Sequence, residues 1–324
     1  MILFLDTQGL LLSTRNGCFR VIHGKIDKII GLNKITSIVV SSKIQIDSTA
    51  LVLSFKADIP IYFTDKFGAV VGVSRSIGFS LASQIRREQV LFVKKKKAIS
   101  WVKDIHILKL NGQLANMKFA LDRKTKDQEG RLKKLKNFEL ILNSISGLKA
   151  KNMDVLRPSL LGKEGAAARA YWQSMALSLD TAFHFEARSQ NPAQDPFNAA
   201  LNYLYGILYT KVESAIYTAG LDATLGIFHT DQYQKPTLAF DLIEPFRPWA
   251  DRFLLELCWQ GEIELNFFDK SMDSVKLNKN GKRLLIPRFL EFMEAKTTFN
   301  NQICTRNTHI SRMAGALSIQ LLNL

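Results

Sequence analysis

Residues 195–249 of this 324-residue chain read DPFNAALNYLYGILYTKVESAIYTAGLDATLGIFHTDQYQKPTLAFDLIEPFRPW and contain a helix with both ends marked. Asp195 can cap the first free N–H groups of a helix, and Pro196 suits its first position. Gly220 is a typical stop signal. These signals predict a helix over residues 196–219. One face of it should pack into a core, because apolar residues recur at three- and four-residue intervals, at Phe197, Leu201, Leu204, Leu208, Val212 and Ile216.

A lone histidine and a pair of acids follow this helix. His229 comes after a glycine-containing turn, and Asp241 and Glu244 lie three residues apart, a spacing that puts both carboxylates on one face of a helix. Pro245 and Pro248 remove the N–H groups that would bond the carbonyls of the two acids. We therefore expect a helix entry or a kink at the acidic pair.

The first 76 residues consist of short β-type runs separated by turn signals. Asn16-Gly17 predicts a hairpin, because both central residues of such a turn favour positive φ, and residues 65–68 are a second candidate turn. A short helix is expected over residues 48–58. The β-type runs are ILFLD, GLLLSTR, CFRVI, ITSIVV, IPIYF and AVVGVS.

Beyond this region the chain is rich in Ala, Leu, Lys, Glu and Gln at helical spacing. The predicted fold class is α+β, with a small N-terminal β domain over residues 1–76 and a larger all-helical domain over residues 77–324. Helices are expected over residues 78–97, 98–120, 129–144, 164–187, 196–219, 241–258, 285–296 and 309–321.

The formal net charge of +15 indicates a polyanionic partner, either nucleic acid or an acidic membrane surface. Residues 86–136 hold sixteen Lys and Arg against five acids, which is most of the excess. A solvated helical face would also explain such a run. We favour a phosphate-binding surface, because the run lies in an already basic protein. The candidate nucleic-acid-binding residues are Arg86, Arg87, Lys94, Lys95, Lys96, Lys97 and Arg169.

Several classes of protein have no basis in this sequence. No apolar run approaches the ~18 residues of a membrane span, and the start MILFL lacks a basic region and a cleavage site, so we expect a soluble, cytoplasmic protein. Three scattered cysteines, Cys18, Cys258 and Cys304, are expected to be reduced thiols. There is no GxxxxGK[ST] loop, no GxGxxG after a strand, no HExxH and no paired CxxC.

Glu164 is the third element of a possible site, at the start of the helical run in LLGKEGAAARAYW. Taken singly, each candidate has an ordinary explanation. Glu164 can be an acid favoured in a first helical turn, His229 a structural histidine, and the acidic pair a solvated one. Together, one imidazole and several carboxylates form a ligand set suited to Mg²⁺ or Mn²⁺. A catalytic metal that bridges them to phosphate oxygens would explain why a basic protein concentrates acids here.

Three sequence blocks carry a resemblance to a known family. They are EGAAARAYW, the run from Asp195 to His229, and KPTLAFDLIEPFRPWADR, with KLNGQLANM ahead of them. Together they resemble the universal CRISPR-associated adaptation integrase, the endonuclease that captures new spacers. The resemblance implies an N-terminal β domain, a helical catalytic domain, a homodimer and a small second CRISPR adaptation protein as partner. It also implies that the substrate is double-stranded DNA, both the protospacer and the CRISPR repeat.

The resemblance further implies a site made of Glu164, His229, Asp241 and Glu244. Glu164, His229 and Glu244 would be ligands of a divalent metal, Mg²⁺ or Mn²⁺, and Asp241 would be a ligand or a partner that orients one. The sequence departs from the family's pattern at Pro245, which stands where another acid is commoner, and at Gly112, which stands where Asn is common. Neither position is one of the expected ligands.

The function expected from these observations is metal-dependent DNA integration, in which a 3′-hydroxyl of a short fragment attacks a phosphodiester of a repeat array. Two alternatives remain from the residues themselves. The chain could be a structure-selective nuclease of branched DNA, or a non-catalytic DNA-binding scaffold whose acids form salt bridges.

Overall fold

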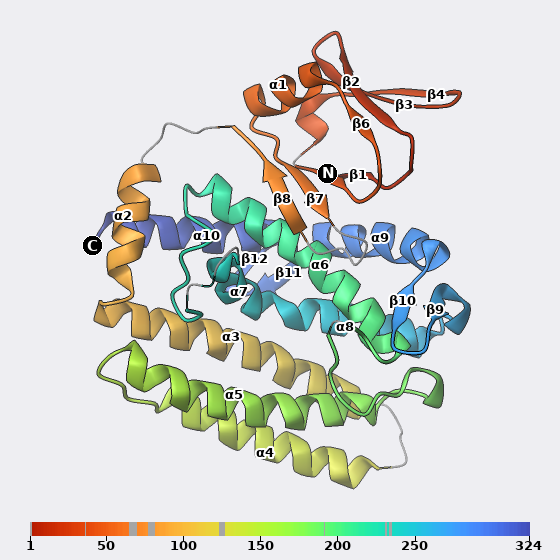
Figure 1. Cartoon of the computed structure of the whole chain (residues 1–324). Coiled ribbons are helices and arrows are strands. Elements are labelled where there is room, and N and C mark those ends of the chain that lie inside the picture. The colour runs from red at the N-terminus through yellow and green to blue at the C-terminus, as the bar shows by residue number, and fades with distance from the viewer. Residues whose placement is uncertain are drawn as a thin grey trace. The chain divides into compact units, whose positions relative to one another are not determined.

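The computed structural model describes residues 2–35, 37–64, 70–76, 82–122, 127–190, 192–230, 232 and 235–324. The chain divides into two compact units, residues 1–82 and 83–324 (Figure 1). The sequence analysis placed this boundary after residue 76. The first unit contains β1 (Ile2–Leu5), β2 (Leu11–Arg15), β3 (Cys18–His23), β4 (Ile26–Ile30), η1 (Leu32–Lys34), β5 (Ser37–Val40), β6 (Gln45–Ile46), α1 (Ser48–Lys56), β7 (Ile61–Thr64) and β8 (Val70–Ser74).

Two four-stranded sheets form this unit, in the orders β1-β5-β7-β8 and β4-β3-β2-β6. Buried side chains from both sheets join in one core that includes Leu5, Leu12, Phe19, Ile38 and Ile61. The alternating apolar residues of the predicted runs therefore point inward from both sheets and pack in one shared hydrophobic core.

The hairpin predicted at Asn16-Gly17 is confirmed. Asn16 has φ 50° and Gly17 has φ 72°, and the flanking strands β2 and β3 pair antiparallel from Arg15 opposite Cys18. The second predicted turn, residues 65–68, lies outside the described residues. The short helix expected over residues 48–58 is present as α1.

Two strands of this unit were not predicted, β4 and β6. Four of the five residues of β4 are exposed, so it lacks the buried alternation by which strands are recognised. Its charged residue Asp27 instead pairs with Arg20 of β3 at 2.6 Å.

The second unit is mostly helical, which confirms the predicted fold class. Two short antiparallel pairs, β9–β10 and β11–β12, are added to it. Its elements are α2 (Ala82–Phe92), α3 (Lys96–Leu121), α4 (Gln128–Ser146), α5 (Met153–Ala176), η2 (Thr181–Phe183), α6 (Pro196–Thr218), α7 (Thr237–Ile243), η3 (Glu244–Phe246), α8 (Arg247–Gln260), η4 (Leu265–Phe267), β9 (Phe268–Lys270), β10 (Val275–Leu277), α9 (Lys279–Glu294), β11 (Lys296–Phe299), β12 (Gln302–Thr305) and α10 (Arg306–Leu322).

Helix α3 is the element around which this unit is packed. It lies against α4 and α5 on one side, and against η3 and α8 on the other (Figure 1). Gly112 makes the second contact possible, because a Cβ at this position would lie 2.8 Å from Cβ of Pro248. The absent side chain lets α3 approach the segment that carries the acidic pair.

Several helix boundaries differ from the predictions: α5 ends at Ala176 and not at residue 187, and α9 begins at Lys279 and not at residue 285. Helix α5 begins at Met153 and not at residue 164, because Asn152 caps it by accepting a hydrogen bond from the N–H of Val155 at 3.1 Å. Glu164 therefore lies in the middle of α5, and its interpretation as a first-turn acid is wrong. The break predicted between residues 97 and 98 lies a few residues earlier, because residues 93–95 form the turn between α2 and α3.

The kink expected at the acidic pair is confirmed. Helix α7 ends at Ile243, the 3₁₀ turn η3 contains Pro245, and α8 starts at Arg247. Elsewhere, no helix in the described part of the chain is both long and apolar enough to cross a membrane. Cys18, Cys258 and Cys304 are free cysteines.

Candidate active site

Helix α6 and helix α7 hold the loop that carries His229. Asp195 caps α6 by accepting from the N–H of Asn198 at 2.8 Å, and the chain leaves the helix through Gly220 at φ 77°. Two hydrogen bonds then attach the loop to the start of α7. The N–H of Leu238 donates to the carbonyl of Ala223 at 2.9 Å, and Oγ1 of Thr237 donates to the carbonyl of Thr224 at 2.6 Å.

The carboxylate of Asp241 is enclosed by this loop. It is 2% exposed and accepts hydrogen bonds from the backbone N–H groups of Ile227 at 2.6 Å, Phe228 at 3.0 Å and His229 at 3.0 Å. Nδ1 of His229 also donates to it at 2.6 Å. These four hydrogen bonds fix the imidazole ring and leave Nε2 as the nitrogen that can accept a proton or bind a metal.

Glu164 and Glu244 meet on a lysine. Nζ of Lys109, on α3, pairs with Oε1 of Glu164, on α5, and lies 2.5 Å from Oε2 of Glu244, in η3. Lys109 is only 9% exposed, and Glu244 is 6% exposed. Three elements that are far apart in sequence thus bring two carboxylates to one cationic point.

The charges in this cluster stabilise one another. Burial raises the pKa of each glutamate, but Lys109 beside Glu164, and Arg247 and Lys109 beside Glu244, outweigh it, and both pKa values lie below the usual range. Burial lowers the pKa of Lys109, and the two glutamates outweigh it, so the pKa of Lys109 is raised. Both carboxylates are therefore ionised at neutral pH and the lysine is charged.

His229 belongs to the same electrostatic environment. Burial lowers its pKa, but the hydrogen bond to Asp241 and the negative charges of Asp241, Glu244 and Glu164 raise it, and the net shift is upward. The ring of Phe228 contacts both His229, at 5.5 Å between ring centres, and His106, at 4.6 Å. The predicted residues thus form two sets, His229 with Asp241 and Glu164 with Glu244 around Lys109.

Two further residues complete the cluster. Nε of Arg247 donates to Oε1 of Glu244 at 2.8 Å, and its guanidinium lies 4.7 Å from the ring centre of Tyr205. His106 donates from Nδ1 to the carbonyl of Val102 at 2.8 Å, which directs its Nε2 towards Oε2 of Glu164 at 3.6 Å. Each glutamate therefore has a second nitrogen-bearing neighbour besides Lys109.

The donor set fits a divalent cation in its chemistry. Two carboxylates converge on one point, and His229 keeps Nε2 free, which is a set that suits Mg²⁺ or Mn²⁺. Among the described residues, no group of three or more His, Cys, Asp and Glu side chains is arranged as a finished metal site. The ammonium of Lys109 lies where the two glutamates would meet a metal.

Lys109, His106 and Arg247 were not among the site residues predicted from the sequence. Lys109 was predicted only as part of the basic run, although His106 and Lys109 are spaced i,i+3 and share one face of a helix. That spacing was the available signal. Arg247 was visible only as the residue three positions after Glu244.

A buried polar network adjoins the cluster. Asp251 is fully buried and accepts hydrogen bonds from the hydroxyls of Tyr171 at 2.9 Å and Tyr205 at 2.6 Å. Asn116 donates to the hydroxyl of Tyr171 at 3.1 Å and to the carbonyl of Pro248 at 2.8 Å. The network holds α3, α5, α6 and α8 in register behind the acids.

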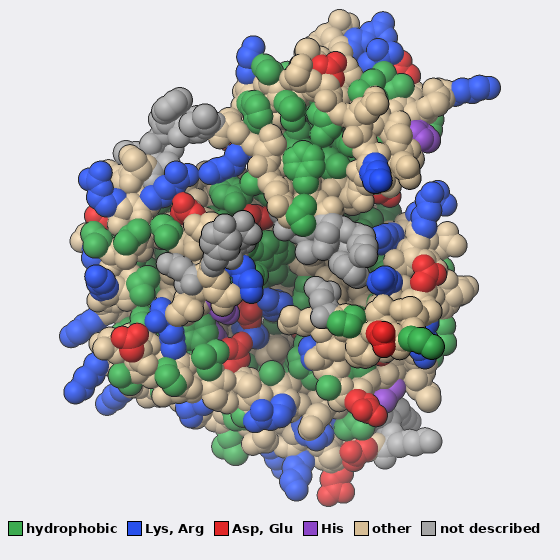
Figure 2. All heavy atoms as spheres, in the orientation of Figure 1, with side chains coloured by type: hydrophobic (Ala, Val, Ile, Leu, Met, Phe, Trp, Pro, Cys, Tyr) green, Lys and Arg blue, Asp and Glu red, His purple; other side chains and the backbone are tan. Residues whose placement is uncertain are grey.

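The predicted nucleic-acid-binding residues lie on three helices, α2, α3 and α5, and in the turn between α2 and α3. Lys94, Lys96 and Lys97 are exposed, whereas Lys95 is half-buried and pairs with Glu88 at 3.2 Å. Figure 2 shows Lys and Arg side chains gathered along the edge of the helical unit where α2 and the start of α3 lie. Arg87 and Arg169 are exposed, and Arg86 is half-buried.

Part of the basic run faces inward. Lys109 belongs to the acid cluster, and Arg131 is fully buried, so neither can bind a phosphate on the surface. Residues 123–126, which include three members of the run, lie outside the described residues.

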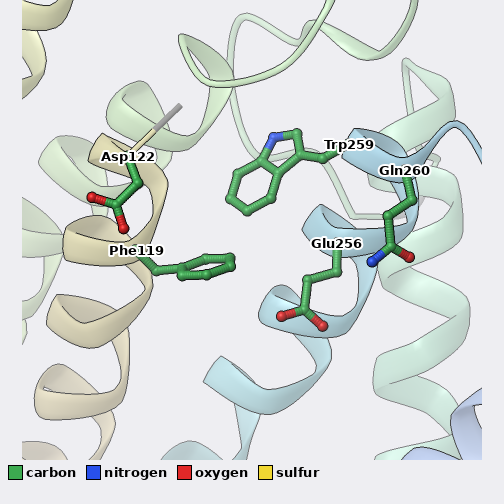
Figure 3. A pocket seen from close by; sticks show the side chains of 5 residues that line it. All are labelled: Phe119, Asp122, Glu256, Trp259 and Gln260. Atoms are coloured by element: carbon green, nitrogen blue, oxygen red, sulfur yellow. The ribbon is translucent and has the colours of Figure 1, made fainter. Parts of the chain in front are cut away.

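A separate pocket of about 260 Å³ lies between the ends of α3 and α8. The side chains of Phe119, Asp122, Glu256, Trp259 and Gln260 line it (Figure 3). None of the predicted site residues contributes to it, so it is not part of the candidate active site.

Comparisons with known proteins agree on one family. The family model described as CRISPR associated protein Cas1 matches residues 3–291. The CRISPR-associated endonuclease Cas1 1 of Archaeoglobus fulgidus is 30% identical over 314 residues, which cover 93% of this chain and 91% of that protein.

Two solved structures share the fold. A chain of a Cas6-RT-Cas1–Cas2 complex matches with a TM-score of 0.81 and 21% identity, over 100% of this chain and 35% of that one. A casposase bound to integration product matches with a TM-score of 0.79 and 20% identity, over 98% of this chain and 91% of that one. At these identities the two structures establish the fold and leave the chemistry to be argued from the site.

Proposed function

This chain belongs to the family of CRISPR-associated protein Cas1, and we propose that Glu164, His229 and Glu244 are the residues with which it joins DNA fragments to a CRISPR repeat array. The chain is a CRISPR-associated endonuclease and integrase that inserts short foreign DNA fragments as new spacers. We propose metal ligation as the role of these three residues, and orientation of His229 as the role of Asp241.

The observation that carries the proposal is the convergence of Glu164 and Glu244 beside an oriented imidazole. Two ionised carboxylates at one buried point form a strong cation site, and the Asp241–His229 pair holds a nitrogen donor beside it. Stability alone does not explain such a cluster, since apolar residues of similar volume in place of buried ion pairs are often as stabilising or more so.

The cofactor we propose is a divalent metal, Mg²⁺ or Mn²⁺, held by Glu164, His229 and Glu244. When bound, it would withdraw charge from a phosphate oxygen and lower the pKa of an attacking hydroxyl. Asp241 would hold His229 with its ring nitrogen Nε2 deprotonated and correctly aimed. We assign Asp241 this orienting role, because its oxygens already accept four hydrogen bonds.

In the reaction we propose, the 3′ oxygen of a DNA fragment forms a bond to a phosphorus of the repeat array. The bond from that phosphorus to the existing 3′ oxygen breaks, so one phosphodiester replaces another and the leaving oxygen takes up a proton. Exposed Lys and Arg residues of α2, α3 and α5 would hold the DNA backbone, and the acids would meet it only through the bound metal.

The partners we propose are double-stranded DNA, a second copy of this chain, and a small second CRISPR adaptation protein. A matching structure is a Cas1–Cas2 complex, which supports the last of these. The homodimer rests on the resemblance to the family. We also propose that the protein acts in the cytoplasm, because the repeat array that it would modify is located there.

A strand-transfer assay with labelled fragment and repeat DNA tests the proposal, run with and without Mg²⁺ or Mn²⁺. We expect joined product only with metal, and its loss in Glu164→Ala, His229→Ala and Glu244→Ala. Glu139→Ala, which removes a partly exposed acid of α4, is the matched control and should remain active. Folding and DNA binding should survive in all four variants, because the phosphate contacts lie elsewhere.

Other outcomes of this assay would favour the alternatives. Cut but unjoined product would indicate a structure-selective nuclease of branched DNA. No product at all, with intact DNA binding, would indicate a non-catalytic scaffold. Full metal-dependent activity in His229→Ala would contradict the ligand assignment.

A further inference from the structure

Lys109 occupies the position that the proposed metal requires. Its ammonium pairs with Oε1 of Glu164 and lies 2.5 Å from Oε2 of Glu244, so it already serves both carboxylates as their shared cation. A bound Mg²⁺ would lie about 2.0–2.1 Å from these oxygens. The ammonium and a metal ion cannot both occupy that point.

The buried setting explains why a cation is needed there without metal. Burial raises the pKa of both glutamates, and the negative charge of Glu164 raises the pKa of Glu244 further. Two ionised carboxylates left unpaired in such a place would destabilise the fold strongly. Lys109 removes that cost and keeps α3, α5 and η3 in contact before any metal arrives.

The second cation of the cluster is held differently. Arg247 donates to the other oxygen of Glu244, Oε1, at 2.8 Å and lies against the face of Tyr205. Its planar guanidinium is fixed by both contacts. Lys109 has a flexible four-carbon stem, so its ammonium can withdraw while its Cα stays in place.

We propose that Lys109 is the internal counter-ion of the metal-free site and that a divalent cation binds by displacing its ammonium from Glu164 and Glu244. The inference rests on the metal site of the proposed function. It makes Lys109 a positioning residue, which holds the two acids together in the metal-free protein and competes with the metal for them.

Replacing the lysine tests this competition without DNA or turnover. Mn²⁺ binding is measured by titration calorimetry, and thermal unfolding is recorded with and without Mn²⁺. We expect Lys109→Met to bind Mn²⁺ at least about 10-fold more tightly than the unchanged protein. In the variant the two buried carboxylates have lost the lysine that competes with the metal, and an unpaired buried charge costs more than the free energy of a tenfold change in affinity. Without metal, the melting temperature of the variant should be lower than that of the unchanged protein. Adding Mn²⁺ should raise the melting temperature of the variant more than that of the unchanged protein.

The control is Lys118→Met, on the same helix. Lys118 pairs with Glu139 at 2.9 Å, and its side chain is 56% exposed, so both its Mn²⁺ affinity and its melting temperature should match those of the unchanged protein. Unchanged or weaker Mn²⁺ binding in Lys109→Met would overturn the inference.

A second measurement uses the unchanged protein and does not depend on how the variant folds. Lysine labelling by reductive methylation is quantified residue by residue with and without Mn²⁺. The reactivity of Lys109 should rise severalfold when Mn²⁺ is present, because its ammonium leaves the carboxylates, while that of Lys118 should not change. Equal reactivity of Lys109 in both conditions would overturn the inference.

His229→Ala distinguishes failure of the proposed metal site from failure of the proposed displacement of Lys109. Suppose that Mn²⁺ binding is lost in His229→Ala, but that Lys109→Met binds Mn²⁺ no more tightly than the unchanged protein and Mn²⁺ does not change the labelling of Lys109. The metal site is then correct and the displacement is wrong. If no Mn²⁺ binding depends on His229, both the metal site and the displacement are wrong.

Discussion

Nδ1 of His229 lies 2.6 Å from Oδ1 of Asp241, and the same carboxylate accepts hydrogen bonds from three backbone N–H groups of the loop that carries the histidine. One acid therefore sets both the path of the loop and the direction of the ring. This arrangement distinguishes Asp241 from Glu244, whose carboxylate faces Lys109 and Arg247 instead.

Asp241→Asn should impair both metal binding and stability. An amide offers one oxygen where the carboxylate offers two, so its NH₂ group would face N–H donors of the loop. We expect Mn²⁺ affinity to fall roughly 10–100-fold, a typical effect of losing a group that orients a ligand. The free energy of unfolding should drop by about 1–3 kcal/mol for the unsatisfied donors. Calorimetry and chemical denaturation measure the two effects.

The control for that variant is Asp269→Asn, at an exposed position of β9. It should alter neither quantity beyond about 0.5 kcal/mol. Normal metal binding in Asp241→Asn, with Glu244→Gln silent as well, would show that the acidic pair is structural.

Gly112→Ala should destabilise the protein, although alanine is the better helix former. The new Cβ would lie 2.8 Å from Cβ and 2.9 Å from Cγ of Pro248, closer than atoms can pack. Overpacking of this kind costs about 1–3 kcal/mol, more than the ~1 kcal/mol that helix propensity favours. Gly315→Ala, in α10 with no atom near its Cβ, should instead stabilise by up to about 1 kcal/mol. Denaturant midpoints of the two variants should therefore move in opposite directions, and a shift in the same direction would count against the close contact.

Asp251 should make stability fall as pH rises from about 4 to 6. Burial raises its pKa from 3.8 to about 6, although the hydroxyls of Tyr205 and Tyr171 and the charges of Arg188 and Arg247 oppose the shift. In that window the folded protein keeps a proton that the unfolded chain has lost, so stability decreases with rising pH. The loss should total about 3 kcal/mol and stay constant above pH 7.

Asp251→Asn removes this titration. The difference in unfolding free energy between the variant and the unchanged protein should shift in favour of the variant by about 3 kcal/mol between pH 4 and 7. Chemical denaturation at several pH values gives this difference directly. A difference that does not vary with pH would show that the carboxyl titrates near its ordinary pKa.

Three exposed lysines, Lys94 in the turn before α3 and Lys96 and Lys97 in the first turn of α3, should contribute to the salt dependence of DNA binding. Each phosphate that a lysine neutralises adds ~0.9 to the slope of log affinity against log salt concentration, because counterions are released. Replacing Lys94, Lys96 and Lys97 by Ala should therefore reduce the slope by up to about 3, without changing sequence preference. Titrations at several salt concentrations, on two unrelated DNA sequences, measure both.

The control for this triple variant is a second triple variant that removes the same charge outside the basic run. Lys270, Lys279 and Lys296 are exposed and lie outside the basic run, so replacing them by Ala should leave the slope nearly unchanged. If both triples reduce the slope equally, the effect is one of overall charge. If neither does, Lys94, Lys96 and Lys97 form a solvated face and the DNA follows another path.

Local signals predicted much of the fold. The capped helix α6, the hairpin at Asn16-Gly17 and the break around Pro245 each depend on a few adjacent residues, and the structure has all three. A cap, a positive φ or a missing N–H acts within one turn of chain, so it can be recognised in the sequence alone. The start of α5 was predicted wrongly: the helix begins at Met153, after the cap of Asn152, and continues through Pro158.

The sequence by itself also supplied the chemistry of the site, an imidazole and three acids in a basic chain, and the resemblance that ties them to one family. Only the tertiary structure decided how they are paired. Lys109 and Glu164 are 55 residues apart, and their contact arises because α3 packs against α5 and, through Gly112, against Pro248. Such a pairing depends on how buried surfaces fit together, and no local pattern encodes that fit. For the same physical reason the sequence counted Lys109 among surface charges, whereas packing makes it the buried partner of both glutamates.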